Sequence, residues 1–243
     1  MATELLLPAQ SDYPDEIFNS DLPPEARVGC AWAYFKTNTL TRFLFRRRVE
    51  ITFGLLPDRS WDRALDAGTG AGFILPTLAH MAREVDGVDL SPVLKYAQVM
   101  LDKRGIHNVR LQQADVLHLP FEARSFDLII CLSVIEHIPD PAAAFAEMAR
   151  ILRPGGIAIV GYPLEHALLR GFENLIRLEK RLYHLIRRDP KQIKGQFHPH
   201  VSRFARIERG YQNILREDNR QNLSLFGLPL YRLVRLSSLA KPE

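Results

Sequence analysis

The sequence predicts an α/β protein with a doubly wound, mostly parallel sheet of about seven strands, the last of them antiparallel. Three observations support this fold. Between residues 64 and 161, short apolar runs alternate with segments of helical spacing. The run 126–133, FDLIICLS, is nearly all apolar, as a parallel strand covered on both faces must be. Near the C-terminus, only two residues separate the runs 223–228 and 231–236, and so short a connection demands an antiparallel pair.

The composition is that of an ordinary globular protein. Of the 243 residues, 47% are hydrophobic and 25% are charged, which excludes wholesale disorder. The two cysteines form no spaced framework, so we expect reduced thiols in a cytoplasmic setting, with Cys131 buried in its apolar run. No run reaches the roughly 20 apolar residues of a membrane-spanning helix. The acidic N-terminus lacks the basic start of a signal peptide.

The charge is unevenly spread along a chain whose net charge is only +4. Residues 1–26 hold six acidic residues and no Lys or Arg, whereas residues 164–216 hold 12 Lys or Arg against five Asp or Glu. The mild total gives no argument for nucleic acid, and no RNA-binding motif is present. The basic segment is interpreted either as a solvated helix face or as a lid that attracts an anionic or lipid-associated ligand at the membrane surface.

The first 60 residues precede the alternating pattern. Residues 1–25 hold four prolines and predict a flexible acidic tail. Residues 26–60 predict a helical cap, because apolar side chains recur at helical spacing until the segment 57–60 breaks the pattern. The main domain is therefore expected over 61–243.

The alternating region divides into five strands and three helices. The predicted strands are 64–67, 85–90, 109–114, 126–133 and 157–161, and the predicted helices are 73–83, 91–104 and 141–152. Ser91 is expected to cap the second helix, with Pro92 in its first turn, and Gly105 to end it. Asp140 is expected to cap the third helix.

After Pro163 the pattern changes to a helical insertion over 164–216, ahead of the last two strands. A long basic amphipathic helix is predicted over 168–188 and a second helix over 201–215. Between them lies His198-Pro199-His200, which lacks the usual spacing of zinc ligands, so we expect no metal site.

A glycine-rich turn follows the first predicted strand. In LDAGTGAGF, residues 65–73, three glycines let a ligand approach the backbone closely. Open α/β sheets bind ligands beyond the carboxyl ends of their strands. Asp89 ends the second strand, where an acidic side chain can accept both hydroxyls of a ribose. The alternatives are a purely structural turn and a plain helix-entry cap at Asp89.

Four stretches within residues 63–163 resemble the class I S-adenosylmethionine-dependent methyltransferases, which have a Rossmann-like fold. The stretches are LDAGTGAG, VDGVDLS, QQADVLHLPFEARSFDLIICLSVIEHI and ARILRPGGIAIV. More narrowly, they are similar to the methyltransferase type 11 and ubiquinone/menaquinone biosynthesis group. The resemblance implies S-adenosyl-L-methionine as the cofactor and a small-molecule methyl acceptor, with transfer to oxygen, carbon or nitrogen.

The resemblance also implies roles for individual residues. The cofactor-binding positions are expected to be Asp66, Gly68, Thr69, Gly70, Gly72, Asp89, Leu90, Asp115, Val116, Leu132 and Ser133. Of these, the residues of the glycine turn would shape the pocket for the methionine part. Asp89 would hold the ribose diol, and Asp115 with Val116 would meet the adenine.

Methyl transfer is an in-line displacement, so a general base is needed only if the acceptor must lose a proton. His137 is the candidate base, and its alternative role is to shape the loop. The candidate acceptor contacts are Trp32, Tyr34, Tyr162 and His166. Plain packing is the alternative for Tyr162.

Two other functions stay open at this point. A nicotinamide-dependent oxidoreductase would use a similar sheet, but Phe73 stands where the dinucleotide fingerprint has Gly or Ala. A non-catalytic partner protein would keep the cofactor fold without turnover. For the acceptor, the basic insertion favours a lipid, a quinone or a glycan precursor.

Overall fold

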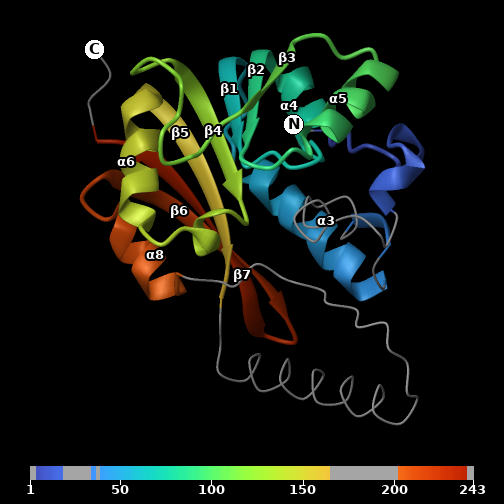
Figure 1. Ribbon diagram of the computed structural model, residues 1–243. Coiled ribbons are helices and arrows are strands. Elements are labelled where there is room, and N and C mark those ends of the chain that lie inside the picture. Colours follow the sequence, from blue (N-terminus) through green and yellow to red (C-terminus); the bar gives the residue numbers. More distant parts are fainter. Residues whose placement is uncertain (1–3, 19–33, 37–38, 165–201, 240–243) are drawn as a thin grey trace.

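The computed structural model of the chain describes residues 4–18, 34–36, 39–164 and 202–239. These residues form one seven-stranded sheet in the order β3-β2-β1-β4-β5-β7-β6, which confirms the predicted fold (Figure 1). The strands are β1 (Trp61–Ala67), β2 (Ala82–Asp89), β3 (Val109–Gln113), β4 (Phe126–Leu132), β5 (Leu152–Pro163), β6 (Leu215–Leu225) and β7 (Leu228–Ser238). The strands β1 to β5 pair in parallel, and β7 runs antiparallel to both β5 and β6.

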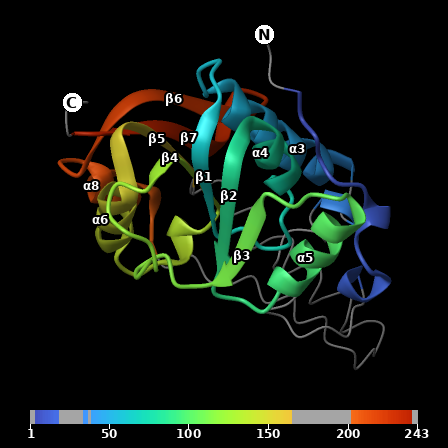
Figure 2. The ribbon, with the colours of Figure 1, turned by 90° about the horizontal axis from the view of Figure 1, so that it is seen from above.

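Helices cover both faces of this sheet, as the view from above shows (Figure 2). The helices are α3 (Thr39–Gly54), α4 (Leu75–Met81), α5 (Leu94–Lys103), α6 (Pro141–Ile151) and α8 (Phe204–Tyr211), with short 3-10 turns η1 (Gln10–Asp12), η2 (Asp15–Phe18) and η3 (Ile135–His137). The strand β4 alternates between the two cores, with Ile130 packing on the side of α3, α4 and α5 and Cys131 on the side of α6 and α8. Cys131 is fully buried, as predicted.

The helices that follow the first two strands are shorter than expected. The glycine turn continues to Ile74, so α4 begins only at Leu75. The helix α5 begins at Leu94 after Val93, so the expected cap at Ser91 is wrong. The Ser91 backbone N–H instead donates to the Asp89 carboxylate at 2.8 Å.

The helix α6 begins at Pro141, as predicted. Asp140 stands at its N-cap position but makes no side-chain capping hydrogen bond.

Residues 4–18 pack on the domain rather than forming a flexible tail. The Tyr13 hydroxyl donates to the backbone oxygen of Ala71 in the glycine turn at 3.1 Å. Tyr13 and Ile17 are buried, and Asp12 forms an ion pair at 3.0 Å with Arg104, the residue after α5. The acidic composition of the segment is thus complemented by a basic residue far away in the sequence.

The C-terminal hairpin is confirmed, but its turn is not where the sequence placed it. The chain reverses at Phe226 and Gly227, with φ of 49° and 78°, rather than at Pro229 and Leu230. A tight hairpin turn needs positive φ at its central residues, which proline cannot adopt. Upstream, α8 ends at Tyr211, and the expected helix over 201–215 is therefore too long.

Several predictions fall on residues outside the described ranges. These are the long helix over 168–188 and the candidates Cys30, Trp32, His166, His198 and His200. Within the described part of the chain, no helix is long and apolar enough to cross a membrane.

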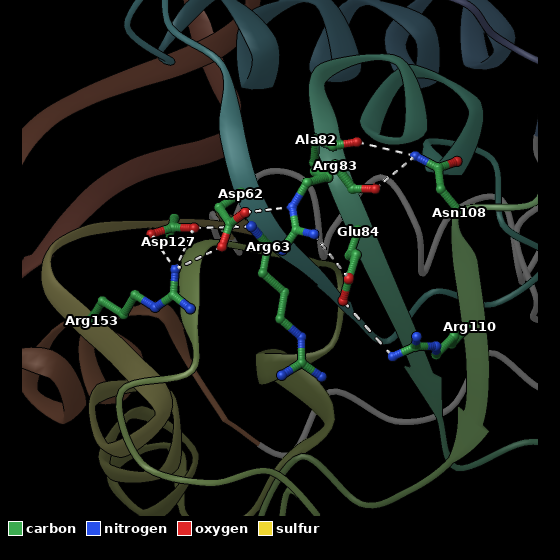
Figure 3. A network of polar contacts seen from close by, with 9 residues as sticks. All are labelled: Asp62, Arg63, Ala82, Arg83, Glu84, Asn108, Arg110, Asp127 and Arg153. Carbon is green, nitrogen blue, oxygen red and sulfur yellow. Dashed lines mark hydrogen bonds and ion pairs between the residues drawn. The ribbon is translucent and has the colours of Figure 1, made fainter.

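The amino edge of the sheet is held by a network of ion pairs (Figure 3). Arg153 bonds Asp127 at 3.0 Å and Asp62 at 3.3 Å, and Arg83 bonds Asp62 at 2.7 Å. Each of these side chains belongs to the second residue of its strand, in β1, β2, β4 and β5. Because the pairs are exposed to water, each contributes little to stability on its own. The network stabilises the amino edge of the sheet. The glycine turn lies at the opposite edge, which the network leaves free for ligand binding.

Candidate functional site

The glycine turn after β1 is fixed by backbone hydrogen bonds to β2. The N–H groups of Gly68 and Thr69 both donate to the carbonyl oxygen of Val88, at 2.8 and 2.9 Å. Gly68 and Gly72 have φ of 83° and 78°, a left-handed conformation that favours glycine. The turn therefore lies at the carboxyl edge of the sheet, where open α/β folds bind ligands.

Asp89 closes this turn from the end of β2. Its Oδ2 accepts from the Gly70 N–H and its Oδ1 from the Ser91 N–H, both at 2.8 Å. A carboxylate offers about four lone-pair positions, so each oxygen keeps one for a ligand hydroxyl. Burial raises the pKa of Asp89, and the two backbone donors act against that shift. The glycine turn and the acid predicted to hold the ribose are thus joined by one hydrogen bond.

Asp66 is the buried acid of the turn. It is 3% exposed, and the Thr69 hydroxyl donates to its Oδ2 at 2.6 Å. Burial, together with the nearby negative charge of Asp89, raises the pKa of Asp66 to about 7 in spite of that hydrogen bond. A carboxylate that resists ionisation in the free protein would be stabilised by a ligand that brings a positive charge.

Asp66 predicts a pH dependence of folding stability. In the unfolded chain this carboxyl ionises near pH 4, so between about pH 4 and 7 the unfolded state binds fewer protons and stability falls as pH rises. Asp66→Asn should remove roughly 2–3 kcal/mol of the decline in unfolding free energy between about pH 5 and pH 8. Urea denaturation of both proteins at the two pH values measures this. Parallel pH profiles for the variant and the wild type would contradict the raised pKa.

The adenine-side candidates lie after β3. The Asp115 Oδ1 accepts from the Leu117 N–H at 2.9 Å, and the Asp115 carbonyl oxygen accepts from the His118 N–H at 2.9 Å. The side chain is therefore held in a tight turn. Val116 beside it is buried, at 7% exposed. The neighbouring β2 ends at Asp89, whose carbonyl oxygen accepts from the Ala114 N–H at 3.1 Å, which brings the two acids to the same edge.

A buried arginine meets the end of β4. Arg48 of α3 is 5% exposed. Its Nη1 donates to Ser133 Oγ at 2.6 Å, and its Nη2 donates to the Tyr34 hydroxyl at 2.9 Å. The guanidinium carbon lies 4.4 Å from the ring centroid of Phe45 and 5.5 Å from that of Tyr231. Such cation–π contacts are strongest where the cation is shielded from water.

Ser133 is held from three sides. Besides the Arg48 contact, its hydroxyl lies 3.0 Å from the Tyr231 hydroxyl, and its N–H donates to the Gly161 carbonyl oxygen at 2.9 Å. Its φ of 57° is a strained conformation for a residue with a side chain. Strained residues persist where their surroundings fix them, and they often lie at functional sites. The structure therefore places the predicted residue Ser133 in a well-defined polar cluster.

The cap covers the glycine turn with aromatic rings. Tyr34 is buried and stacks on Phe73, with ring centroids 3.3 Å apart and planes 9° apart. The Tyr13 hydroxyl bonds the same turn at Ala71. Tyr34, which was predicted as an acceptor contact, thus packs against the end of the glycine turn.

The other candidates are placed as follows. His137 ends the 3-10 turn η3 just after β4 and is partly exposed, whereas the preceding Glu136 is 3% exposed. Leu132 is buried and Leu90 is 66% exposed. Tyr162 is fully buried on the side of α6 and α8, with its hydroxyl 3.4 Å from Glu208. This position favours the packing interpretation of Tyr162 over an acceptor contact.

Sequence reasoning missed Arg48 and Tyr231. Arg48 is the last of three consecutive arginines, residues 46–48, yet it is buried on α3 together with Val49 and Thr52. A charged residue on the apolar stripe of an amphipathic helix was the available signal. Tyr231 gave no such signal, because an aromatic residue in a strand usually packs in a core.

Comparison with known proteins identifies methyltransferases as similar to this chain. Residues 65–160 match the family described as methyltransferase domain, which confirms the resemblance seen in the sequence. Ubiquinone biosynthesis O-methyltransferase of Paracidovorax citrulli is 35% identical over 96 residues, 39% of this chain and 40% of that protein. The uncharacterized methyltransferase YcgJ of Bacillus subtilis is 31% identical over 161 residues, 64% of this chain and 60% of that protein. The chain thus matches less than two thirds of the length of either relative.

Solved structures share the fold. N-methyltransferase NodS of Bradyrhizobium japonicum, in complex with S-adenosyl-L-homocysteine, superposes with a TM-score of 0.62 at 16% identity. The superposition covers 89% of this chain and 97% of that one. The two chains therefore share the overall fold.

Proposed function

We propose that this chain, whose residues 65–160 match the methyltransferase domain family, transfers a methyl group from S-adenosyl-L-methionine to a small-molecule acceptor. The observation that carries the proposal is the glycine turn tied to Asp89 at the carboxyl edge of the sheet. The names of the relatives support it, because they include an O-methyltransferase and an N-methyltransferase that holds S-adenosyl-L-homocysteine.

The residues at this edge fit such a cofactor. A Cβ at Gly68 would lie 2.1 Å from a methyl group of Val134, so only a bare backbone fits there. Asp89 keeps lone pairs for the ribose hydroxyls. The positive sulfonium would favour the ionised form of the buried Asp66. Asp115, Val116, Leu132 and Ser133 would line the rest of the cofactor.

The bound cofactor would supply a methyl group on an activated leaving group. The task of the chain is then to hold donor and acceptor in line, an alignment that can contribute about 7–11 kcal/mol in favourable cases. Where the acceptor must lose a proton, His137 is the group we propose to take it. Its place after β4 and its partial exposure suit that role better than the buried Glu136 does.

Calorimetry tests the first step directly. We expect S-adenosyl-L-homocysteine to bind the folded protein, and NADH to give no fluorescence change on titration. Binding of NADH instead would support the oxidoreductase alternative. A folded protein that binds neither ligand would reject the proposed function.

Turnover separates an active enzyme from a non-catalytic partner protein. A single-turnover assay with methyl-labelled cofactor and a broad acceptor extract should transfer the label to a small molecule. Binding of the cofactor product without any transfer would favour the partner protein.

For the acceptor we propose a lipid, a quinone or a glycan precursor.

A further inference from the structure

Most large apolar side chains of the described residues are buried, but a few are exposed. The exposed ones are Leu40, Phe43, Leu90, Phe226 and Leu239. Phe226, at the tip of the β6–β7 hairpin, is 99% exposed, and Leu40 and Phe43, at the start of α3, are 50% and 57% exposed. Two separate elements thus end in exposed apolar side chains.

Both elements project from the same edge of the sheet. Arg48, within α3, contacts Ser133 at the carboxyl end of β4. Leu55, the residue after α3, accepts a hydrogen bond through its carbonyl oxygen from Arg235 in the second half of β7. The helix α3 therefore begins beyond the carboxyl edge and runs back along the sheet. Its first turns lie at the lower end of the molecule, as does the tip of the hairpin (Figure 1).

The hairpin leaves the sheet at the same level. Tyr231 pairs with Pro163, the last residue of β5, and the guanidinium of Arg48 lies 5.5 Å from the centroid of the Tyr231 ring. From this shared layer, five residues of strand and turn reach Phe226, roughly 15 Å further. Five to eight residues of helix reach Phe43 and Leu40, roughly 8–12 Å further.

The charge of this end is positive. Residues 39–49 contain four arginines and no acidic residue, and residues 221–239 contain no acidic residue either. Arg46 is exposed beside Phe43, and Arg47 is exposed and paired with Glu50 at 2.6 Å. Apolar tips flanked by arginine are the composition that binds anionic membrane surfaces.

We propose that the first turns of α3 and the tip of the β6–β7 hairpin dock this protein on a bilayer containing anionic lipids. Two projecting elements with one or two large apolar side chains each suit a fluid interface, which requires no matching pockets. Because both elements flank the ligand edge, docking would bring that edge to the lipid surface. A lipid-soluble acceptor would then enter at this edge. That step rests on the proposed function, whereas the docking itself does not.

Vesicle co-sedimentation tests the proposal. The full chain is mixed with vesicles of phosphatidylcholine alone or of phosphatidylcholine with phosphatidylglycerol. We expect binding to the anionic vesicles, weaker binding to the neutral ones, and release at high salt. The double variant Phe43→Ser/Phe226→Ser should bind at least about tenfold more weakly, and Arg46→Glu should lose the preference for anionic lipid.

Matched controls lie at the other end of the molecule. Leu239→Ser removes an equally exposed leucine after β7, and Arg110→Glu reverses an exposed arginine at the amino edge of β3. Both should bind vesicles like the wild type. Equal binding to neutral and anionic vesicles, no binding, or wild-type binding of the double variant would overturn the proposal. So would a wild-type dimer in light scattering that the double variant loses, because a second copy would then cover this surface.

Calorimetry with S-adenosyl-L-homocysteine keeps the two proposals apart. The docking variants should bind this ligand with wild-type affinity, since none of the substituted residues contacts the glycine turn. Vesicle binding without ligand binding in the wild type would sink the proposed function and leave the docking surface standing.

Discussion

Asp89→Ala should weaken the binding of S-adenosyl-L-homocysteine by at least about tenfold, which corresponds to about 1.4 kcal/mol. The carboxylate orders the glycine turn through Gly70 and, in the proposed complex, accepts the ribose hydroxyls. Hydrogen bonds to a charged group typically contribute about 1.5–3 kcal/mol, so losing the ligand contacts alone accounts for the expected loss. Calorimetry at a fixed pH gives the two dissociation constants.

The interpretation needs controls for folding and for charge. Asp102→Ala removes an exposed carboxylate of α5 that accepts a hydrogen bond from the Gln98 side chain at 2.7 Å, and it should bind the ligand like the wild type. Asp89→Asn keeps an acceptor for the Gly70 N–H and should lose less affinity than Asp89→Ala. Unchanged affinity in a folded Asp89→Ala variant would mean that Asp89 is only a structural tie between the turn and β2.

The sequence was sufficient for the sheet because its signals are local. The run around Cys131 is apolar on both faces, and the structure buries alternate residues of β4 in the two cores. The glycine turn and the acid of β2 are likewise local features, each fixed by the strand before it. Their hydrogen bond follows from the parallel pairing of β1 and β2.

The predictions that failed have two causes: one was overturned by a contact between distant residues, and two were overturned by local backbone geometry. The first 25 residues look like a tail by composition, but Tyr13 finds a partner 58 positions away in the glycine turn. Ser91 has the sequence context of a cap, yet Asp89 takes its N–H and delays the helix. The hairpin turn was expected at Pro229 and Leu230, but proline cannot adopt a positive φ, and Phe226 and Gly227 form the turn instead.

The site shows the same division. The candidate cofactor residues lie together at one edge, as their positions at strand ends predict. The polar cluster at the end of β4 depends on how α3 and β7 pack against that edge, and this packing joins Arg48, Ser133 and Tyr231. No local pattern relates residue 48 to residue 231, so the cluster could be found only in the folded chain.

Gly68→Ala should abolish measurable binding of S-adenosyl-L-homocysteine and lower the unfolding free energy by about 2–5 kcal/mol. Two costs add up. A left-handed backbone costs a residue with a Cβ about 1–2 kcal/mol, and Gly68 has φ of 83°. The new Cβ would also lie 2.1 Å from a methyl group of Val134, an overpacking that typically costs about 1–3 kcal/mol. Urea denaturation and calorimetry measure the two effects.

Gly227→Ala separates these costs, because Gly227 has nearly the same φ, 78°, but nothing within 4 Å of its would-be Cβ. It should lose only the backbone part of the stability and keep full ligand affinity. Val134→Ala in the Gly68→Ala background should then recover the unfolding free energy lost to overpacking. The loss caused by the left-handed backbone should remain. If the two glycine variants lose equal stability, Val134 moves aside at no cost. The close contact between the turn and the loop after β4 would then not be the reason that position 68 excludes a side chain. Loss of ligand affinity in Gly68→Ala but not in Gly227→Ala would still show that ligand binding depends on the geometry of the glycine turn.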